Sequence, residues 1–289
     1  MKVIVTGSSG FIGSRLCYFL SQQRYSTIRV SRTAKPNSQK DLICDLETNQ
    51  LAKGAMSGVD TIFHLAGYAH DLSDPQKSKK KYVKLNVDAT KKLAIQASKE
   101  GVKNFIFVSS VKAGCPDIKR DASEQKPESI YGETKRQAEL ELLDFSKHTN
   151  MNILIVRPSL VYGPDIKGNL LSMKRAIQAG WFPPLPQIKN ARSMVHVDDL
   201  VSAIILVKEK GINGEIYNVT DGKDYSTTEI YETLYKLNKK DPPKLRLPLI
   251  LLNLLSFIPG RINKIVSKLV EDERYSSSKI ESLGFCAKL

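Results

Sequence analysis

The chain opens with the stretch Val3-Ile4-Val5-Thr6-Gly7-Ser8-Ser9-Gly10-Phe11-Ile12-Gly13. Its first four residues predict a short buried strand, and the apolar periodicity that follows predicts a helix over residues 12–23. Gly7 permits a sharp turn, Gly10 lets a phosphate approach the backbone, and Gly13 lets the helix pack close to the strand. The helix N-terminus offers free N–H groups and a positive dipole end. The stretch therefore predicts a strand–turn–helix unit that binds the phosphates of a dinucleotide.

The same alternation of short apolar runs and longer amphipathic stretches continues through the first half of the chain. Further strands are expected at residues 27–30, 61–65, 104–109 and 152–157, and further helices at 82–99 and 131–146. Because the strands are continuously apolar, they are typical of a parallel sheet that helices cover on both faces. With right-handed crossovers, this predicts an α/β fold with a doubly wound, Rossmann-type parallel sheet.

The composition of the sequence changes after Arg157, where prolines become frequent. We expect a dinucleotide-binding domain over residues 1–165 and a smaller C-terminal substrate-binding lobe over residues 166–289, with residues 195–210 packing back on the first domain. In the second part we expect a helix at 198–208 and a strand at 215–219. Ser226-Thr227-Thr228-Glu229 has the pattern of a capping box that opens a helix.

The charge of the chain is strongly basic. The formal net charge is +14 over 289 residues, and lysines concentrate at residues 77–84 and 236–244. Such runs attract polyanionic substrates, nucleic acids or anionic membranes, but a solvated basic surface is the more ordinary explanation, which we favour. No nucleic-acid-binding motif accompanies the charge, so we expect no nucleic-acid partner. The cysteines and histidines have neither disulfide-framework nor metal-ligand spacing, and we expect no metal.

The most apolar stretch, residues 247–258, is too short to span a bilayer and is interrupted by Pro248, Asn253 and Ser256. Basic residues follow it, so it could form a helix on a membrane surface. We favour a buried helix of the smaller lobe. The pattern of residues 1–6 indicates a buried strand rather than a signal peptide. We therefore expect a cytoplasmic location, with peripheral association at the inner face of the membrane as the alternative.

The second decisive motif is Tyr131-Gly132-Glu133-Thr134-Lys135. Residues at i and i+4 share one face of a helix, so the phenol of Tyr131 and the ammonium of Lys135 can point into one cleft. A phenol titrates near 10 in water, and nearby positive charge lowers that value towards the range of a useful base. Ser110, at the end of the preceding strand, is the better of two serines to complete a hydroxyl relay. Together with the glycine-rich turn, this indicates hydride transfer with a nicotinamide dinucleotide.

The end of the second strand indicates which dinucleotide is used. A carboxylate there accepts hydrogen bonds from the ribose 2′-hydroxyl of NAD, whereas an arginine pairs with the 2′-phosphate of NADP. The sequence has Ser31 and Arg32, with Lys35 close behind, and no carboxylate. This favours NADP over NAD, although Arg32 could instead stack on the adenine or face water. Asp45 and Leu46 are expected near the adenine, and Ser9, Phe11 and Ile12 complete the phosphate turn.

Seven short stretches occur in order along nearly the whole chain: Thr6-Gly7-x-x-Gly10-x-x-Gly13, His64-Leu65-Ala66-Gly67, Asn86-Val87, Phe107-Val108-Ser109-Ser110, Tyr131-x-x-x-Lys135, Arg157-Pro158-x-x-Val161-Tyr162-Gly163-Pro164 and Val195-His196-Val197-Asp198-Asp199-Leu200. In this set and order the chain resembles an extended short-chain dehydrogenase/reductase of the nucleotide-sugar epimerase/dehydratase branch. The resemblance implies that Tyr131 is the acid/base, that Lys135 binds the nicotinamide ribose, and that Ser110 orients the reacting oxygen. It also implies that Asn86 supports the site and that Leu65, Ala66 and Gly67 line the cofactor.

The second half resembles a narrower group that acts on UDP-linked N-acetylated or 6-deoxy sugars in surface-polysaccharide synthesis. The segments Lys167-Gly168-Asn169 and Asn190-x-Arg192-Ser193 carry this likeness. It implies that Asn169 and Arg192 meet the substrate diphosphate, which a bidentate guanidinium suits; a structural salt bridge is the alternative for Arg192. The resemblance also implies a homodimer, and it suggests that the lobe lacks the family's usual C-terminal tail.

These inferences predict hydride transfer at C4 of a UDP-linked hexose. A 4-ketoreductase would consume NADPH, whereas a 4-epimerase would use NAD without net consumption of the cofactor. Ser31 and Arg32 slightly favour the reductase. A dehydratase is disfavoured because no Asp-Glu pair stands beside Ser110. The alternatives are a non-catalytic dinucleotide sensor or scaffold, and a reductase of small ketones, which would have no use for Asn169 and Arg192.

Overall fold

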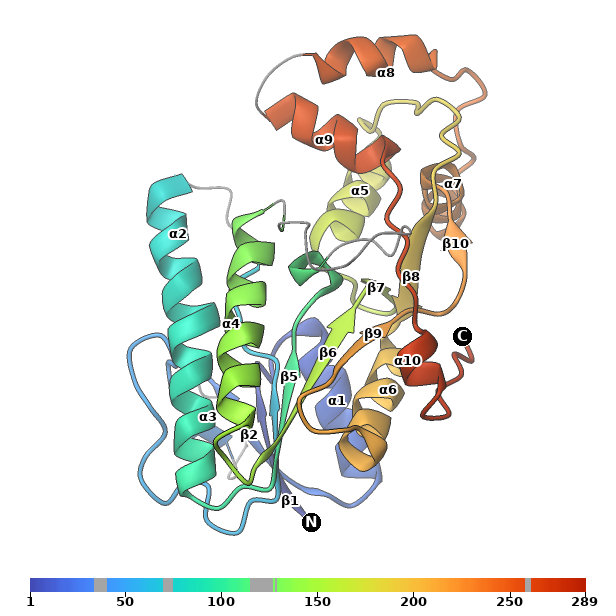
Figure 1. The fold of residues 1–289 in the computed structure, drawn as a ribbon. Coiled ribbons are helices and arrows are strands. Elements are labelled where there is room, and N and C mark those ends of the chain that lie inside the picture. Colours follow the sequence, from blue (N-terminus) through green and yellow to red (C-terminus); the bar gives the residue numbers. More distant parts are fainter. Residues whose placement is uncertain (34–40, 70–74, 115–126, 128, 258–260) are drawn as a thin grey trace.

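A computed structural model of the chain describes residues 1–33, 41–69, 75–114, 127, 129–257 and 261–289. Its centre is a parallel sheet, which in the described part of the chain has the strand order β3-β2-β1-β4-β5-β6-β9 (Figure 1). The order reverses between β1 and β4, as in a doubly wound fold. The predicted fold class is therefore confirmed. The strands are β1 (Lys2–Thr6), β2 (Ser26–Ser31), β3 (Asp41–Ile43), β4 (Thr61–His64), β5 (Asn104–Val108), β6 (Asn152–Pro158) and β9 (Ile216–Val219).

Alternate residues of the strands enter two separate cores because successive side chains in a strand point to opposite faces. Val3 and Val5 of β1 pack beneath α1 (Phe11–Gln22) and α6 (Val197–Lys210). Ile4, between them, packs on the other face beneath α3 (Ala89–Lys99) and α4 (Ile130–Ser146). Helices thus cover both faces of the sheet, which explains why its strands lack a polar side.

The helix expected at residues 82–99 begins earlier and is not regular. It starts as α2 (Pro75–Val83), passes through one π-helical turn (Lys84–Asp88) and continues as α3. The lysine-rich residues 77–81 have no apolar periodicity, so this first part of the helix could not be predicted from the pattern. The π-helical turn contains Asn86, which is fully buried, and such turns often occur at functional sites.

A smaller lobe lies above the carboxyl ends of the strands (Figure 1). It contains a second sheet, in the order β10-β8-β7, and several helices. The capping box predicted at Ser226 and Glu229 is present and opens α7. The elements of this part are β7 (Leu160–Tyr162), α5 (Gly168–Ala179), β8 (Arg192–His196), β10 (Asp224–Tyr225), α7 (Thr227–Leu237), α8 (Leu249–Ser256) and α9 (Arg261–Val270).

Three elements that follow residue 166 pack with the larger sheet. Besides α6, these are β9, which pairs in parallel with β6, and α10 (Ser278–Glu281), whose Ile280 enters the core beneath α6. The division of the chain after residue 165 stays a prediction, but the structure shows that the chain crosses between the two parts more than once.

The expectation of a buried helix within residues 247–258 is wrong for most of its described side chains. Helix α8 lies at the outer end of the lobe (Figure 1), and among its side chains that the structure describes only Leu252 is buried, against Ile188 and Val266. Ile250, Leu254 and Phe257 are exposed. Hydrophobicity alone could not show this, because an apolar run does not specify whether a second element covers it.

Candidate active site

The glycine-rich turn between β1 and α1 has the close approaches that its sequence predicts. Gly7 has a φ of +66°, and a Cβ there would lie 2.7 Å from the backbone nitrogen of Ala66. A Cβ on Gly13 would lie 2.2 Å from the carbonyl oxygen of Gly7. Within the part of the chain that the structure describes, no side chain caps the start of helix α1, and its first turn contains no acidic residue. Its positive end is therefore uncompensated at Gly10, Phe11 and Ile12, which fits the phosphates of a dinucleotide.

A buried polar chain fixes the neighbouring turn after β4. The hydroxyl of Thr6 accepts a hydrogen bond from the backbone N–H of Ala66 and bonds to Nδ1 of His64 at 2.7 Å. Nε2 of His64 bonds to Thr90 at 2.8 Å. Burial, with a smaller effect of Lys135, lowers the pKa of His64 to about 3. His64 therefore stays neutral and holds Leu65, Ala66 and Gly67 beside the glycine-rich turn.

The residues predicted to select the dinucleotide lie at the end of β2 and after β3. The hydroxyl of Ser31 donates to the carbonyl of Thr33 at 2.7 Å, and Arg32 is exposed. The carboxylate of Asp45 accepts a hydrogen bond from the backbone of Glu47, and Leu46 is buried in the core. Lys35 lies outside the described residues. The structure thus leaves Arg32 open to solvent, and its predicted role stays a prediction.

Tyr131 stands in the first turn of α4. The hydroxyl of Ser129 caps this helix by accepting from the N–H of Gly132 at 3.1 Å. Burial raises the pKa of Tyr131 to about 12, and a hydrogen bond with Ser110 acts in the opposite direction. Ser109, the other candidate, has a buried hydroxyl with no hydrogen-bond partner among the described residues. The structure therefore brings Ser110, and not Ser109, to the phenol.

Lys135, one turn further along α4, is almost completely buried. Its ammonium donates to the carbonyl oxygen of Val108 at 3.0 Å and lies 4.5 Å from the centre of the Phe107 ring. A Cβ on Gly67 would lie 3.3 Å from Nζ, so the ammonium adjoins the predicted cofactor turn. Burial lowers the pKa of Lys135 to about 8, and the negative charge of Glu139 partly opposes this. Lys135 is still mostly protonated at neutral pH.

Asn86 connects the catalytic helix with the turn after β4. Its side-chain oxygen accepts from the N–H of Tyr68 at 2.7 Å, and its amide donates to the carbonyl of Tyr68 and to the hydroxyl of Thr134. Thr134 is the residue immediately before Lys135 in the sequence. Asn86 therefore supports the position of α4 against the cofactor turn.

Two contributors to the site were not found from the sequence. The carboxylate of Glu139, fully buried, accepts two hydrogen bonds from Arg157 at 2.8 and 2.5 Å. The ring of Tyr82 lies 6.5 Å from that of Tyr131. Glu139 continues the i, i+4 series from Tyr131 and Lys135, which is a signal that could have identified it. Tyr82 carried no such signal.

The predicted diphosphate ligands lie in the lobe. Asn169 is exposed in the first turn of α5. Arg192, at the start of β8, donates to Glu273 at 3.0 Å and to the carbonyl of Lys268. Glu273 also pairs with Lys112, two residues after Ser110. Arg192 is therefore joined through one carboxylate to the segment that carries Ser110, and its contact with a diphosphate stays a prediction.

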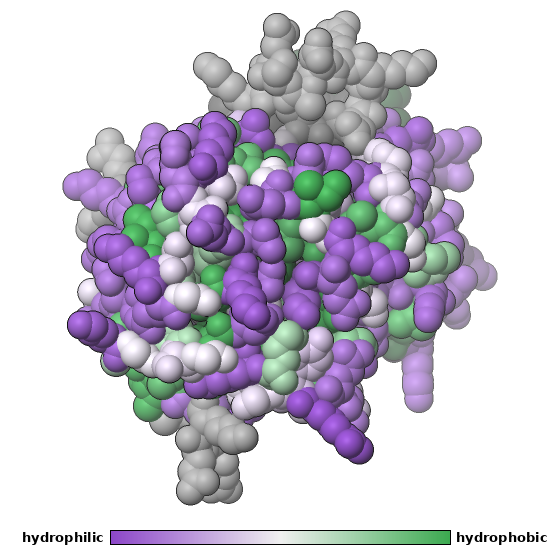
Figure 2. Space-filling model, turned by 60° about the horizontal axis from the view of Figure 1, so that its bottom comes forward, coloured by the Kyte–Doolittle hydropathy of each residue, from purple (hydrophilic) through white to green (hydrophobic). Residues whose placement is uncertain are grey.

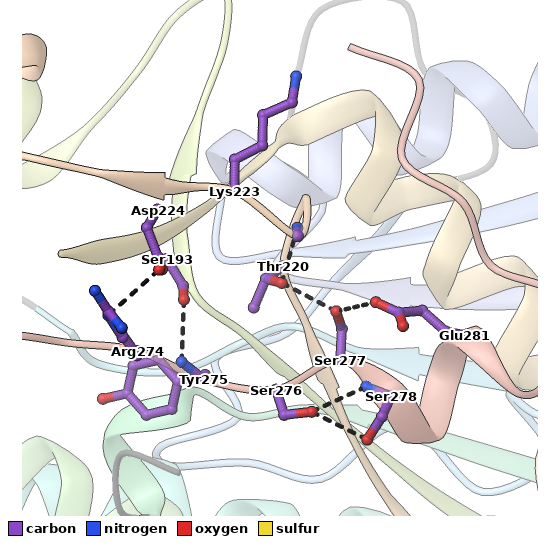
Figure 3. A pocket seen from close by; sticks show the side chains of 11 residues that line it. Ser193, Thr220, Lys223, Asp224, Arg274, Tyr275, Ser276, Ser277, Ser278 and Glu281 are labelled. Atoms are coloured by element: carbon purple, nitrogen blue, oxygen red, sulfur yellow. Dashed lines mark hydrogen bonds and ion pairs between the residues drawn. The ribbon is translucent and has the colours of Figure 1, made fainter. Parts of the chain in front are cut away.

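A polar cavity of about 320 Å³ lies elsewhere in the lobe, between β8, the turn before β10 and residues 274–278 (Figure 3). Ser193 lines it, and because Ser193 follows Arg192 on β8, the two side chains point to opposite faces. Figure 3 shows Arg274 paired with Asp224, and Ser277 bonded to Thr220 and Glu281. The residues that line this cavity include none of the predicted catalytic, cofactor-binding or substrate-binding residues.

Comparison with known proteins agrees with this geometry. Residues 3–220 match the model of the NAD dependent epimerase/dehydratase family. The chain belongs to this family. It is accordingly an enzyme of the NAD-dependent epimerase/dehydratase type with an extended short-chain dehydrogenase/reductase fold, as the sequence resemblance predicted.

Two curated relatives match most of the length of this chain. It is 30% identical over 246 residues to a UDP-glucose 4-epimerase of Vibrio cholerae, covering 81% of this chain and 74% of that protein. It is 29% identical over 296 residues to the N-acetyl-alpha-D-glucosaminyl-diphospho-ditrans,octacis-undecaprenol 4-epimerase of Escherichia coli O157:H7, covering 99% of this chain and 86% of that protein.

Solved structures show the same fold at lower identity. A UDP-glucose 4-epimerase of Thermotoga maritima with UDP-glucose superimposes with a TM-score of 0.81 at 23% identity, covering 100% of this chain and 94% of that one. A UDP-glucuronic acid 4-epimerase of Bacillus cereus, in complex with UDP-glucuronic acid and NAD, gives 0.79 at 21% identity, covering 100% and 95%.

Proposed function

We propose that this family enzyme transfers hydride at C4 of a UDP-linked hexose, N-acetylated or 6-deoxy, as a 4-epimerase. The observation that carries the proposal is the arrangement around α4. The phenol of Tyr131 bonds to Ser110 at the end of β5, and the ammonium of Lys135 lies between Val108 and Gly67. Both relatives described above are named as 4-epimerases, which supports this assignment.

Each residue has a defined task in this reaction. A bound nicotinamide dinucleotide would supply a hydride acceptor and donor. Gly7, Gly10 and Gly13 hold its phosphates against the N-terminus of α1. Tyr131 removes the proton of the C4 hydroxyl and returns it, while Ser110 orients the reacting oxygen. Because the pKa of Tyr131 is about 12, positive charge is needed to favour the phenolate, and the protonated Lys135 contributes it.

The segment after β5 argues against dehydration. A dehydratase needs a further acid or base beside the hydroxyl residue. Here Ser110 is followed by Val111 and Lys112, and Lys112 is paired with Glu273. Asn169 and Arg192 are proposed to meet the diphosphate, a role that requires Arg192 to exchange Glu273 for the substrate.

Reduction of a 4-keto sugar by NADPH is the second candidate function. It is favoured by Ser31 and the exposed Arg32 at the end of β2, where no carboxylate occurs. Several of the similar solved structures are complexes with NAD. The proposed preference for NADP therefore rests on these two residues alone. The homodimer and the place in surface-polysaccharide precursor synthesis are likewise proposals, supported by the family resemblance.

Cofactor content and turnover would test the function. We would incubate the purified protein with UDP-GlcNAc, UDP-glucose and a UDP-4-keto-6-deoxy-N-acetylhexosamine, each with and without NADPH. Copurified NAD and interconversion of UDP-sugars without added cofactor are expected for an epimerase. Stoichiometric oxidation of NADPH by the keto sugar would establish the reductase instead.

The matched variants are Tyr131→Phe and Tyr18→Phe. Each removes one phenolic oxygen, but Tyr18 is exposed on α1. We expect Tyr131→Phe to lower kcat by about a hundredfold or more, because it removes the general acid/base, and Tyr18→Phe to leave it unchanged. Full activity of Tyr131→Phe, or no conversion of any of these sugars by the wild-type protein, would contradict the proposal.

A further inference from the structure

The outer end of the lobe carries an unusual concentration of exposed apolar side chains on and around α8. We call these seven residues the α8 patch: Leu245, Leu247, Leu249, Ile250, Leu251, Leu254 and Phe257. Ile250 is 71% exposed, Leu254 57% and Phe257 80%. Scattered exposed apolar residues are normal on a protein, but a contiguous group usually marks a binding surface.

The helix geometry places the two most exposed apolar residues of α8 on one face. Ile250 and Leu254 are four residues apart, which aligns them along one side of the helix, and the exposed Phe257 follows directly after the last helical residue. Leu252 points to the other side and is buried against Ile188 and Val266. Leu252 therefore attaches α8 to the lobe, while the opposite side presents apolar groups to the surroundings.

The opposite end of the molecule has a different character. Figure 2, which brings the bottom of the molecule forward, shows a mostly hydrophilic face on which apolar residues occur singly or in small groups. The concentration of apolar side chains on the α8 patch is therefore not repeated on this face.

Basic residues surround the α8 patch in the sequence. Between residues 236 and 268 the only acidic residue is Asp241, whereas the basic ones are Lys236, Lys239, Lys240, Lys244, Arg246, Arg261, Lys264 and Lys268. Lys236, Lys239, Lys244 and Lys268 are exposed. An apolar face flanked by cations is the pattern of a helix that lies in the interface of an anionic bilayer.

The position of α8 relates this surface to the active site. In Figure 1, α8 and α9 lie at the same end of the molecule as the N-terminus of α4, which carries Tyr131. The lysine-rich α2 also begins at this end. Attachment through α8 would therefore turn the catalytic end of the protein towards a membrane. Within the described residues, no helix combines the length and apolar character required to cross a bilayer.

We propose that the α8 patch docks the enzyme on an anionic membrane surface, with its apolar side chains inserted among the lipid headgroups. A second copy of the chain is a poorer occupant, because two such strongly basic segments would repel each other. With the proposed function as its basis, docking extends the substrate class to a hexose diphosphate whose lipid stays in the bilayer, because such a molecule would meet the catalytic end of the docked enzyme. The docking itself does not depend on that activity.

Vesicle binding tests the docking without any turnover. The full chain is mixed with phosphatidylcholine vesicles that contain no phosphatidylglycerol or about one-third of it, and bound protein is separated by flotation. We expect binding only to the anionic vesicles, and a reduction of about threefold or more when salt rises from about 0.1 M to about 0.5 M. Conversion of soluble UDP-sugar is measured separately, so failure of the proposed function and failure of docking are distinguishable.

Two variants locate the binding surface. The triple variant Ile250→Ser, Leu254→Ser, Phe257→Ser should lower vesicle partitioning by at least about tenfold, with unchanged circular dichroism and unchanged turnover of soluble substrate. Ile212→Ser, which alters a residue 64% exposed after α6, should bind as the wild type does. The proposal is overturned by absent binding, by equal binding to neutral vesicles, or by unaltered binding of the triple variant. It is also overturned if sedimentation shows that the triple variant only dissociates a self-associated form.

Discussion

Replacing Lys135 by methionine is expected to stabilise the cofactor-free protein while it abolishes catalysis. Lys135 is 3% exposed, and burial lowers its pKa from 10.5 to about 8. Protonating this side chain is therefore less favourable in the folded than in the unfolded chain, by about 3 kcal/mol. Methionine has a similar length, carries no charge and can retain the contact with the Phe107 ring.

The net gain is smaller than this figure because one contact is lost. The ammonium donates a hydrogen bond to the carbonyl of Val108 at 3.0 Å, which contributes about 1 kcal/mol. A gain of about 2 kcal/mol remains, which corresponds to a rise in Tm of about 5 °C for a chain of this size. Activity should fall by about a hundredfold or more, because the cation that favours the phenolate of Tyr131 is gone.

The pH dependence gives this prediction its sharpest test. Below about pH 8 Lys135 is charged in both the folded and the unfolded wild-type chain, so the full free-energy cost of burying the ammonium lowers the stability. Between about pH 8 and 10.5 the folded protein releases the proton before the unfolded chain does, and this cost disappears as the pH rises. The advantage of Lys135→Met should therefore be full near pH 7 and small near pH 10, measured by thermal unfolding. Lys147→Met, at an exposed site beyond α4, should change Tm little at either pH. A destabilised variant, or an advantage that is equal at both pH values, would refute the reasoning.

Two further predictions concern contacts that the structure defines. Glu139→Gln leaves the guanidinium of Arg157 partly unpaired in a buried site and should lower the free energy of unfolding by about 3 kcal/mol, measured by chemical denaturation. Glu141→Gln breaks only an exposed ion pair with Lys91 and should have almost no effect. Equal effects of the two variants would show that the buried ion pair contributes no more than the exposed one. Gly13→Ala places a Cβ 2.2 Å from the carbonyl oxygen of Gly7, so titration calorimetry should show that the Kd for NAD rises by about tenfold or more. Ser14→Ala, at the exposed neighbouring position, should bind NAD as the wild type does. Normal binding by Gly13→Ala would show that α1 need not approach the turn so closely.

The fold was predictable because its signals are local and repeated. Continuous apolar strands alternate with amphipathic helices, and the glycine spacing at Gly7, Gly10 and Gly13 specifies the turn between the first two elements. The first part of the long helix before Asn86 was not predicted, because residues 77–81 are nearly all lysine and show no periodicity. Helical propensity alone is a weak guide where no apolar face exists.

The candidate site was predictable in part for the same reason. Tyr131 and Lys135 lie four residues apart on one helix, so their common face follows from helix geometry. The choice of Ser110 over Ser109 was also made from the sequence, and the structure brings Ser110 to the phenol. The partners of Arg192 and Lys112 were not predictable, because Glu273 lies far from both in the sequence and has no motif of its own.

The sequence by itself determined the parallel sheet, the glycine-rich turn and the pairing of a phenol with an ammonium on α4. Each of these depends on spacing within a few residues, where backbone geometry leaves few alternatives. The tertiary structure alone decided the burial of Lys135, the ion pair of Glu139 with Arg157 and the exposure of α8. Burial and long-range partners depend on which elements pack together, and the free energy of a charged or apolar side chain changes by several kcal/mol with that environment.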